Sequence, residues 1–184
     1  MLQLEPIWQA DQQQAQFRRL LDAMAHPGRC YASLGQGNED EVVLAILATL
    51  LDVEVTLADP HQLLREEDWP MLQAPSVSPA LADYILCDAS QAPTFTPKLG
   101  SLPNPEQSAT LILVVNQLGS GDTRLKLTGP GIEHASMLAI DGLATDWLTR
   151  RAEWNGAFPL GVDWILADAI QLTAIPRTTR LEML

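Results

Sequence analysis

Two short apolar runs near the end of the chain predict its clearest pair of strands. Residues 161–167 and 170–175 are each short for a helix, and the first run contains two β-branched residues. Only two residues separate the runs, so a tight turn is expected and the strands should be antiparallel neighbours. Pro176 should end the second strand, because proline has no N–H group to donate within a sheet.

Apolar residues spaced three and four apart predict the helices. A helix is expected over residues 11–25, with Asp11 capping its start and with Pro27 and Gly28 following its end. Residues 40–51 predict a second helix that is apolar on nearly every side. Such a helix should be buried on more than one face, by the core or by a neighbouring subunit. A third helix is expected over residues 143–154. The predicted buried face of the first helix consists of Phe17, Leu20, Leu21 and Met24.

The remaining apolar runs predict a sheet. Residues 109–116 have almost no polar face, which is typical of a buried strand, and an antiparallel hairpin with residues 124–128 is expected. Residues 91–105 contain four prolines and are predicted to be a loop outside the core. That loop serves as a lid, as an arm that clasps a partner, or simply as a connection between elements. Shorter elements are expected as strands over 29–34, 52–57 and 82–87, helical turns over 61–69, and a turn over 35–38.

These elements together predict one α/β domain that spans residues 1–184. Helices and strands alternate in the first half of the chain, whereas hairpins dominate the second half. The expected architecture is a three-layer α/β/α sandwich with a mixed sheet, because each helix must bury its apolar face against a sheet.

Composition and charge exclude several classes of protein. The chain has 184 residues, 47% hydrophobic and 18% charged, which is typical of a globular domain. The sequence shows neither a signal peptide nor an apolar run of about 18 residues, and two cysteines are too few for a disulfide framework. A cytoplasmic protein is therefore expected. A net charge of −12 argues against binding to nucleic acid or to an anionic membrane. The acidity serves solubility, or it matches a basic partner subunit.

No group of residues predicts a catalytic centre or a cofactor site. Glycines at Thr128-Gly129-Pro130-Gly131 could approach a phosphate, but the proline removes a donor, so a structural turn is the simpler interpretation. Pyridoxal phosphate requires a buried lysine. Lys98 lies in the proline-rich loop and Lys126 is expected to face away from the core, so no cofactor is expected. The three histidines lack the spacing of metal ligands, and Cys30 is expected to be an inert buried thiol.

The segment after Pro176 is the best candidate for a binding function. It places two cations and two hydroxyl groups at the end of a predicted strand. Asp163, the only charged residue in the neighbouring run, is expected to pair with Arg177 across the hairpin, which is a structural role. The residues predicted to contact a partner or a phosphate are Arg29, Arg177, Thr178, Thr179 and Arg180.

Four stretches of the sequence, in the same order, resemble a known family. They are FRRLLDAMAHPG at 17–28, ATLILVV at 109–115, LKLTGPGI at 125–132, and PLGVD at 159–163 followed by AIPRTTR at 174–180. These stretches are similar to the PhnH family, the H subunits of the bacterial carbon–phosphorus lyase system. Residues 60–105 show no matching pattern.

The resemblance implies both a fold and a set of partners. The fold would be a reduced form of the pyridoxal-phosphate-dependent transferase fold without its cofactor site. The H subunit would assemble with the G, I and J subunits into the carbon–phosphorus lyase core complex. With the G, I and L subunits it would be needed to attach alkylphosphonate to the ribose C1 of ATP, displacing adenine.

Two hypotheses about function follow from the sequence. In the first, the chain is a non-catalytic or accessory subunit of that complex and, when free, a C2 homodimer formed through the apolar helix. In the second, it is a stand-alone phosphate- or phosphonate-binding protein or a small transferase. That protein would use Arg29, Arg177, Arg180 and the turn at 128–131 to hold its ligand.

Overall fold

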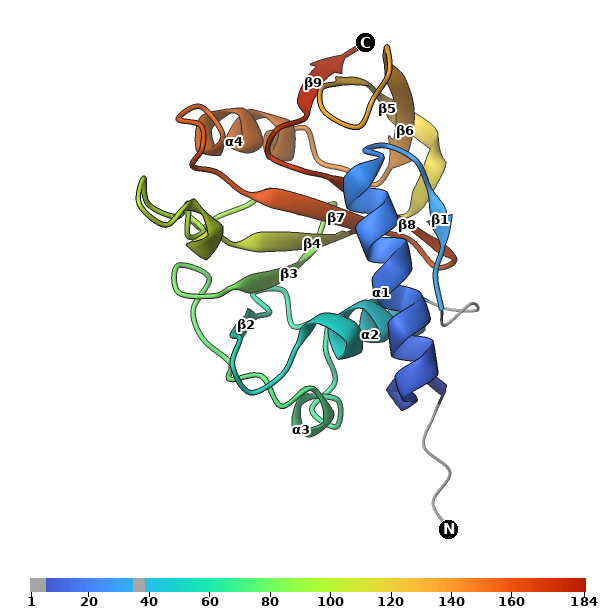
Figure 1. Cartoon of the computed structure of the whole chain (residues 1–184), viewed down its shortest axis with the longest axis vertical. Coiled ribbons are helices and arrows are strands. Elements are labelled where there is room, and N and C mark those ends of the chain that lie inside the picture. Colours follow the sequence, from blue (N-terminus) through green and yellow to red (C-terminus); the bar gives the residue numbers. More distant parts are fainter. Residues whose placement is uncertain (1–5, 35–38) are drawn as a thin grey trace.

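The protein, described by a computed structural model over residues 6–34 and 39–184, is built around a six-stranded mixed sheet (Figure 1). The strand order is β1-β8-β7-β4-β3-β2. Four neighbouring strands are parallel: β2 (Leu57–Ala58), β3 (Tyr84–Asp88), β4 (Thr110–Val114) and β7 (Asp163–Ala167). The sheet is completed by β8 (Gln171–Ile175), which is antiparallel to both β7 and β1 (Tyr31–Ala32).

The predicted C-terminal hairpin is confirmed. Strands β7 and β8 pair antiparallel with Trp164 opposite Ile175, and β8 ends immediately before Pro176. Asp168 fixes the turn between them, because its carboxylate accepts the backbone N–H groups of Ile170 and Gln171, each at 2.9 Å. The short spacing in the sequence therefore identified both the strands and their pairing.

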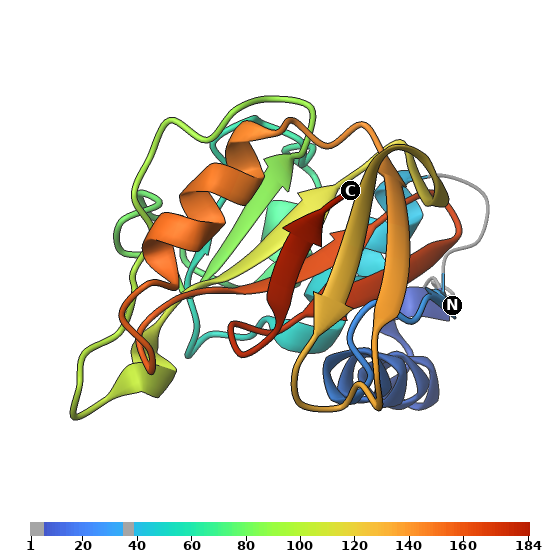
Figure 2. The same cartoon turned by 90° about the horizontal axis from the view of Figure 1, so that it is seen from above.

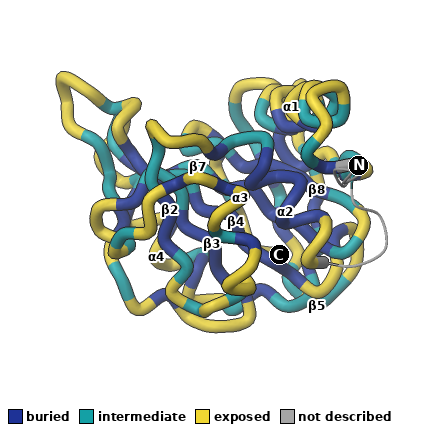
Figure 3. The backbone as a smooth tube through the Cα atoms, turned by 90° about the horizontal axis from the view of Figure 1, so that it is seen from below, coloured by how far each residue is buried: buried dark blue, intermediate teal, exposed yellow. Residues whose placement is uncertain are grey.

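Alternate residues of the central strands face two different hydrophobic cores. In β4, Leu111 and Leu113 face one core, whereas Ile112 and Val114 face the other. Figure 3 shows buried backbone concentrated on these strands and on α2, with exposed segments around them. A strand that is covered on both faces reads as a continuous apolar run, which is the pattern that predicted β4.

Two helices cover one face of the main sheet: α1 (Ala10–Ala25) and α2 (Glu39–Leu50). The predicted helix α2 is confirmed, and so is its burial on several sides. Ile46 and Leu47 pack toward the sheet, whereas Leu44 and Ala45 lie against Ile7 near the 3-10 helix η1 (Pro6–Trp8). The chain itself therefore covers the apolar faces of α2, and no neighbouring subunit is needed to explain them.

The opposite face of the main sheet is covered by α4 (Asp146–Trp154) and by a second, three-stranded sheet (Figure 2). The strands of that sheet are β6 (Ser136–Asp141), β5 (Gln117–Thr128) and β9 (Arg180–Met183), in that order across it. The α/β prediction with a mixed sheet and helices on its faces is confirmed. The second sheet was not predicted, and the likeness to the transferase fold stays a prediction.

The predicted hairpin between residues 109–116 and 124–128 is wrong. Strand β4 lies between β3 and β7 and is parallel to both, so it has no free edge for an antiparallel partner. Residues 124–128 belong to β5, which pairs with β6 and β9 instead. Closeness along the chain suggested a hairpin, but the tight turn after β4 passes the chain to the other sheet.

The predicted buried face of α1 is only partly correct. Leu20 is buried, but Phe17 and Leu21 are 46% and 53% exposed. Gln16 is buried in their place, because its side-chain amide donates to Ser33 Oγ at 3.0 Å. The helix follows Gln9 as its cap residue rather than Asp11.

Several short elements also differ from their predictions. The strand expected over 52–57 is reduced to β2, since residues 53–55 form a turn and bend. Helical structure expected over 61–69 begins only at α3 (Trp69–Leu72). Pro70 is tolerated in its first turn, because a backbone N–H group there would have no acceptor within the helix. A 3-10 helix, η2 (Pro105–Gln107), precedes β4. The turn expected over 35–38 lies outside the described residues. Among the described helices, none is long and apolar enough to cross a membrane.

Candidate functional site

The segment after β8 is anchored by Arg177, whose donors are engaged by the protein itself. Its Nη2 and its backbone N–H donate to the carboxylate of Asp163 at 2.5 and 2.6 Å. The two side chains are only 16% and 20% exposed. The predicted pair across the β7–β8 hairpin is therefore confirmed. The guanidinium also reaches the carbonyl of Pro105 at 2.9 Å and Ser108 Oγ at 2.5 Å.

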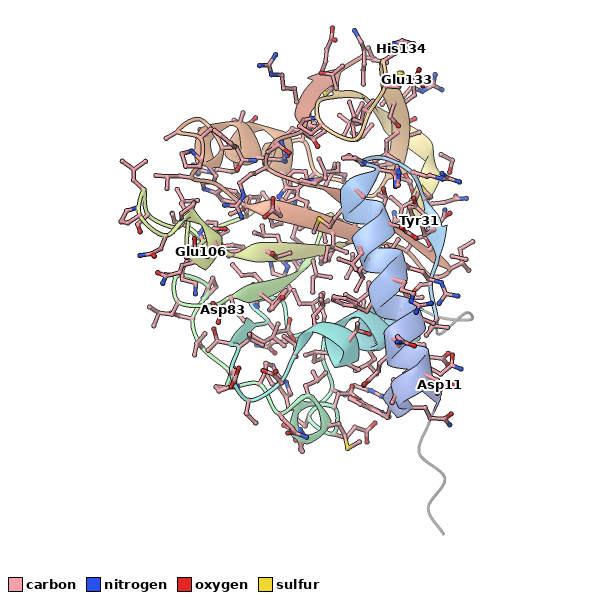
Figure 4. All side chains as sticks on the ribbon, viewed as in Figure 1. Asp11, Tyr31, Asp83, Glu106, Glu133 and His134 are labelled. Carbon is pink, nitrogen blue, oxygen red and sulfur yellow. The ribbon has the colours of Figure 1, made fainter. Side chains whose placement is uncertain are left out.

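These contacts fasten the proline-rich segment to the main sheet. A second ion pair joins Lys98 Nζ to Asp83 Oδ1 at 2.5 Å, close to the edge where β3 and β4 begin (Figure 4). Burial alone would raise the pKa of Asp83, but hydrogen bonds from Lys98 and Thr56 outweigh it and lower the pKa. Phe95 stacks on Trp154 with ring centroids 6.3 Å apart. The segment is a loop, as predicted, but Phe95 and Leu99 pack against the hydrophobic core, so the prediction that it lies outside the core is wrong for these two residues.

Arg151 on α4 is a buried cation that the sequence analysis missed. It is 5% exposed, and its Nη2 and Nη1 donate to the carbonyls of Pro176 and Thr179 at 2.7 and 3.2 Å. Its guanidinium lies 5.3 Å from the ring centre of Trp164. Burial lowers the pKa of Arg151 to about 10, against the opposing effect of Asp163, so it stays charged at neutral pH. Arg151 therefore ties α4 to the segment between β8 and β9.

An open groove of about 660 Å³ lies beside this segment, between α4 and β9. Of the predicted contact residues, Arg177, Thr179 and Arg180 line it together with Arg151. Thr179 is 2% exposed, and neither its Oγ1 nor Arg151 Nε has a hydrogen-bond partner within the described chain. The structure thus brings three of the five predicted residues to one groove.

The other two predicted residues lie elsewhere. Thr178 is exposed in the turn before β9, outside the lining of the groove. Arg29 is exposed near β1, where its guanidinium lies 5.5 Å from the ring centre of Tyr31. Both residues were predicted as contacts because they lie next to a turn or a strand end in the sequence, and that position did not predict where their side chains lie.

The turn at residues 128–131 has a structural role. The N–H of Ile132 donates to the carbonyl of Gly129 at 3.2 Å, which closes the turn. Gly131 has a φ of +79°, and a Cβ atom at this position would overlap the carbonyl oxygen of Ala25 at the end of α1. The glycines therefore permit close packing of two backbone segments, as the simpler interpretation of the sequence held.

The remaining candidate groups are separate from one another. His134 lies at the surface beside Glu133, between β5 and β6 (Figure 4), with an N–O distance of 3.9 Å. Burial raises the pKa of both Cys30 and Cys87, which makes thiolate formation harder. Within residues 6–34 and 39–184, no three His, Cys, Asp or Glu side chains are placed to hold a metal ion together.

Comparison with known proteins identifies the family. A family model described as "Bacterial phosphonate metabolism protein (PhnH)" matches residues 6–182. A "Putative C-P lyase subunit protein HtxG" of Stutzerimonas stutzeri is 42% identical over 177 residues, covering 96% of this chain and 89% of the relative. An "Alpha-D-ribose 1-methylphosphonate 5-triphosphate synthase subunit PhnH" of Rhizobium meliloti (strain 1021) is 28% identical over 200 residues, covering 97% and 92%. The protein therefore belongs to the PhnH family of bacterial phosphonate metabolism proteins.

Proposed function

We propose that this protein is a non-catalytic, accessory subunit of a carbon–phosphorus lyase system that works in organic phosphonate catabolism. The observation that carries the proposal is the match to relatives named as subunits, which extends over at least 96% of this chain. The use of polar groups supports the accessory role. The Nη donors of Arg177 and Arg151 are directed to the protein's own carboxylate and carbonyl oxygens, so these groups are already occupied.

We infer a more specific role from the family. The subunit assembles in the cytoplasm with the G, I and J subunits, and it acts with the G, I and L subunits. Their joint product is a ribose 1-alkylphosphonate 5-triphosphate, made from ATP and an alkylphosphonate with release of adenine. The chain contributes a single domain to that assembly, and its net charge of −12 suits a basic partner surface.

The isolated protein is expected to show no turnover. Incubated alone with ATP and methylphosphonate, it should release neither adenine nor methane above a protein-free control, because no acid, base or nucleophile set converges in the described residues. Chromatography of the nucleobase and headspace analysis of the gas measure the two products. Adding the G, I and L subunits should produce adenine, and omission of this chain should abolish it. Reproducible turnover by the stringently purified chain alone would contradict the accessory role.

The free protein is expected to be a C2 homodimer. The apolar faces of α2 no longer support this expectation, but Phe17 and Leu21 lie one turn apart on α1 and are 46% and 53% exposed. Sedimentation should therefore give about twice the chain mass of 20.1 kDa, and Leu21→Asp should shift the mass toward the monomer. A mass of one chain at every concentration would show that the exposed pair does not mediate self-association.

The alternative function is a stand-alone phosphate- or phosphonate-binding protein. The lining of the α4–β9 groove by Arg151, Arg177 and Arg180 is the observation that favours it. Calorimetric titration with ATP and with methylphosphonate separates the two functions. Saturable binding by the isolated chain that is lost in Arg180→Ala would support the alternative, whereas heats equal to dilution would support the accessory subunit.

A further inference from the structure

Strand β9 leaves one edge of the second sheet open. In the described chain it pairs with β5 alone, at the end of the order β6-β5-β9. The N–H of Leu184 donates to the carbonyl of Arg124 at 3.0 Å. Backbone groups alternate between the two edges of an antiparallel strand. Counting back from residue 184 with the observed register, the N–H and C=O groups of Leu181 and Met183 therefore point to the open edge.

The open edge faces the groove beside α4. Figure 2 shows β9 between α4 and β5, and the groove of about 660 Å³ is lined from both β9 and α4. Leu148 and Ala152 line it from the helix, and Leu181 and Met183 line it from the strand. The groove thus combines apolar walls with a row of unpaired peptide groups. These are the two features by which a sheet edge accepts an extended segment.

The charge of the groove differs from that of the chain. The described residues that line it include three arginines and no acidic residue, in a protein whose net charge is −12. Two of these guanidinium groups already bind internal groups: Arg177 binds Asp163, and Arg151 binds the carbonyl of Pro176. Few donors are therefore open to grasp a compact anion, whereas the charge still favours an acidic chain laid along the strand.

We propose that the α4–β9 groove is a docking site for an extended, acidic segment of another polypeptide of the complex, which adds to β9 as a fourth strand. The proposal rests on the proposed function. The incoming strand lies about 4.8 Å from β9 and exchanges hydrogen bonds with Leu181 and Met183. Its inward side chains contact Leu148 and Ala152, and its acidic side chains lie near Arg180.

A pair of proline substitutions tests the open edge. Leu181→Pro removes an N–H group that makes no bond to β5, so the fold should be retained while docking is blocked. Met137→Pro is the matched control, because the same alternation places its N–H on the outer edge of β6, at the opposite side of the sheet. The affinity of each variant for the purified assembly of the G, I and J subunits is measured by biolayer interferometry, and urea unfolding checks the fold. Leu181→Pro should weaken binding by about tenfold or more, and Met137→Pro should leave it unchanged.

A pair of charge reversals tests the acidic character of the partner segment. Arg180→Glu at the groove and Arg18→Glu on the exposed face of α1 change the net charge by the same amount. Only Arg180→Glu should weaken binding by about tenfold or more, and its effect should shrink as salt is raised. Equal effects of the two reversals would show that overall charge, rather than the groove, governs association.

The outcomes separate the docking site from the proposed function. If the unmodified protein does not bind the assembly at all, the proposed function fails. If it binds and both groove variants bind equally well, the proposed function stands and the docking site is overturned. If Leu181→Pro instead converts a homodimer into a monomer without weakening the assembly, the edge joins two copies of this chain, and the proposal is wrong. Saturable binding of inorganic phosphate that Arg180→Glu abolishes would identify an anion site instead.

Discussion

Replacing Arg177 with alanine should lower the free energy of unfolding by about 3 kcal/mol or more, because it leaves the partly buried carboxylate of Asp163 without its cation. Asp163 is 20% exposed, so solvent replaces little of what is lost. The substitution also removes the bonds to Pro105 and Ser108, which hold the proline-rich segment against the main sheet. One side chain thus stabilises the β7–β8 hairpin and the segment that precedes β4.

Urea unfolding of a double-mutant cycle measures this coupling. Asp163→Ala should also destabilise the protein, and the double variant should lose clearly less than the sum of the two single losses. Arg180→Ala is the matched control, since that exposed arginine should change stability by less than about 0.5 kcal/mol. Additive losses would show that the pair is not coupled. Single variants that are as stable as the unmodified protein but fail to assemble would assign the segment to an interface.

The sequence predicted those parts of the fold that depend on nearby residues. The β7–β8 hairpin follows from two apolar runs separated by two residues, and β4 follows from a run with no polar face. Helix α2 was predicted to within one residue at its end. In each case the polarity of a few neighbouring residues indicates how many faces of the element are buried, so the prediction needs no information from distant parts of the chain.

The sequence could not predict which strands meet across the fold. β5 follows β4 closely and alternates in polarity, so a hairpin was the economical expectation, but β4 is fully paired by β3 and β7. Parallel pairing joins strands that are far apart in the chain, and no local pattern specifies it. The sequence likewise could not predict what covers α2, because the pattern of apolar residues is the same whether the core or another subunit buries them.

The candidate site was predicted in part for a similar reason. The pair of Asp163 and Arg177 was visible because the hairpin places the two residues on adjacent strand ends. Arg151 was missed, although it lies four residues after Trp147 and three before Trp154, on the buried face of α4. An arginine at helical spacing with two tryptophans is the signal that could have identified it, because this spacing places it on the buried face of the helix, where its guanidinium lies over the ring of Trp164.

Gly131→Ala should destabilise the protein by about 3 kcal/mol or more. This loss is expected because the turn at residues 128–131 has a structural role, which requires no ligand or partner. Two effects add. A residue with a side chain is strained at a φ of +79°, and its Cβ would overlap the carbonyl oxygen of Ala25. The end of α1 and the β5–β6 connection would have to separate, which disrupts the packing of α1 on the main sheet. Urea unfolding followed by circular dichroism measures the loss.

Gly119→Ala separates the two effects, because Gly119 has a nearly equal φ of +84° and no atom within 4 Å of the added Cβ. It should cost only the backbone strain, about 1–2 kcal/mol, so the difference between the variants isolates the clash with α1. Equal losses would mean that the turn moves freely away from Ala25 and that its glycines serve conformation alone. A Gly131→Ala protein that is as stable as the unmodified one would remove the structural explanation of the motif, and the phosphate-binding interpretation of Thr128-Gly129-Pro130-Gly131 would then have to be tested directly.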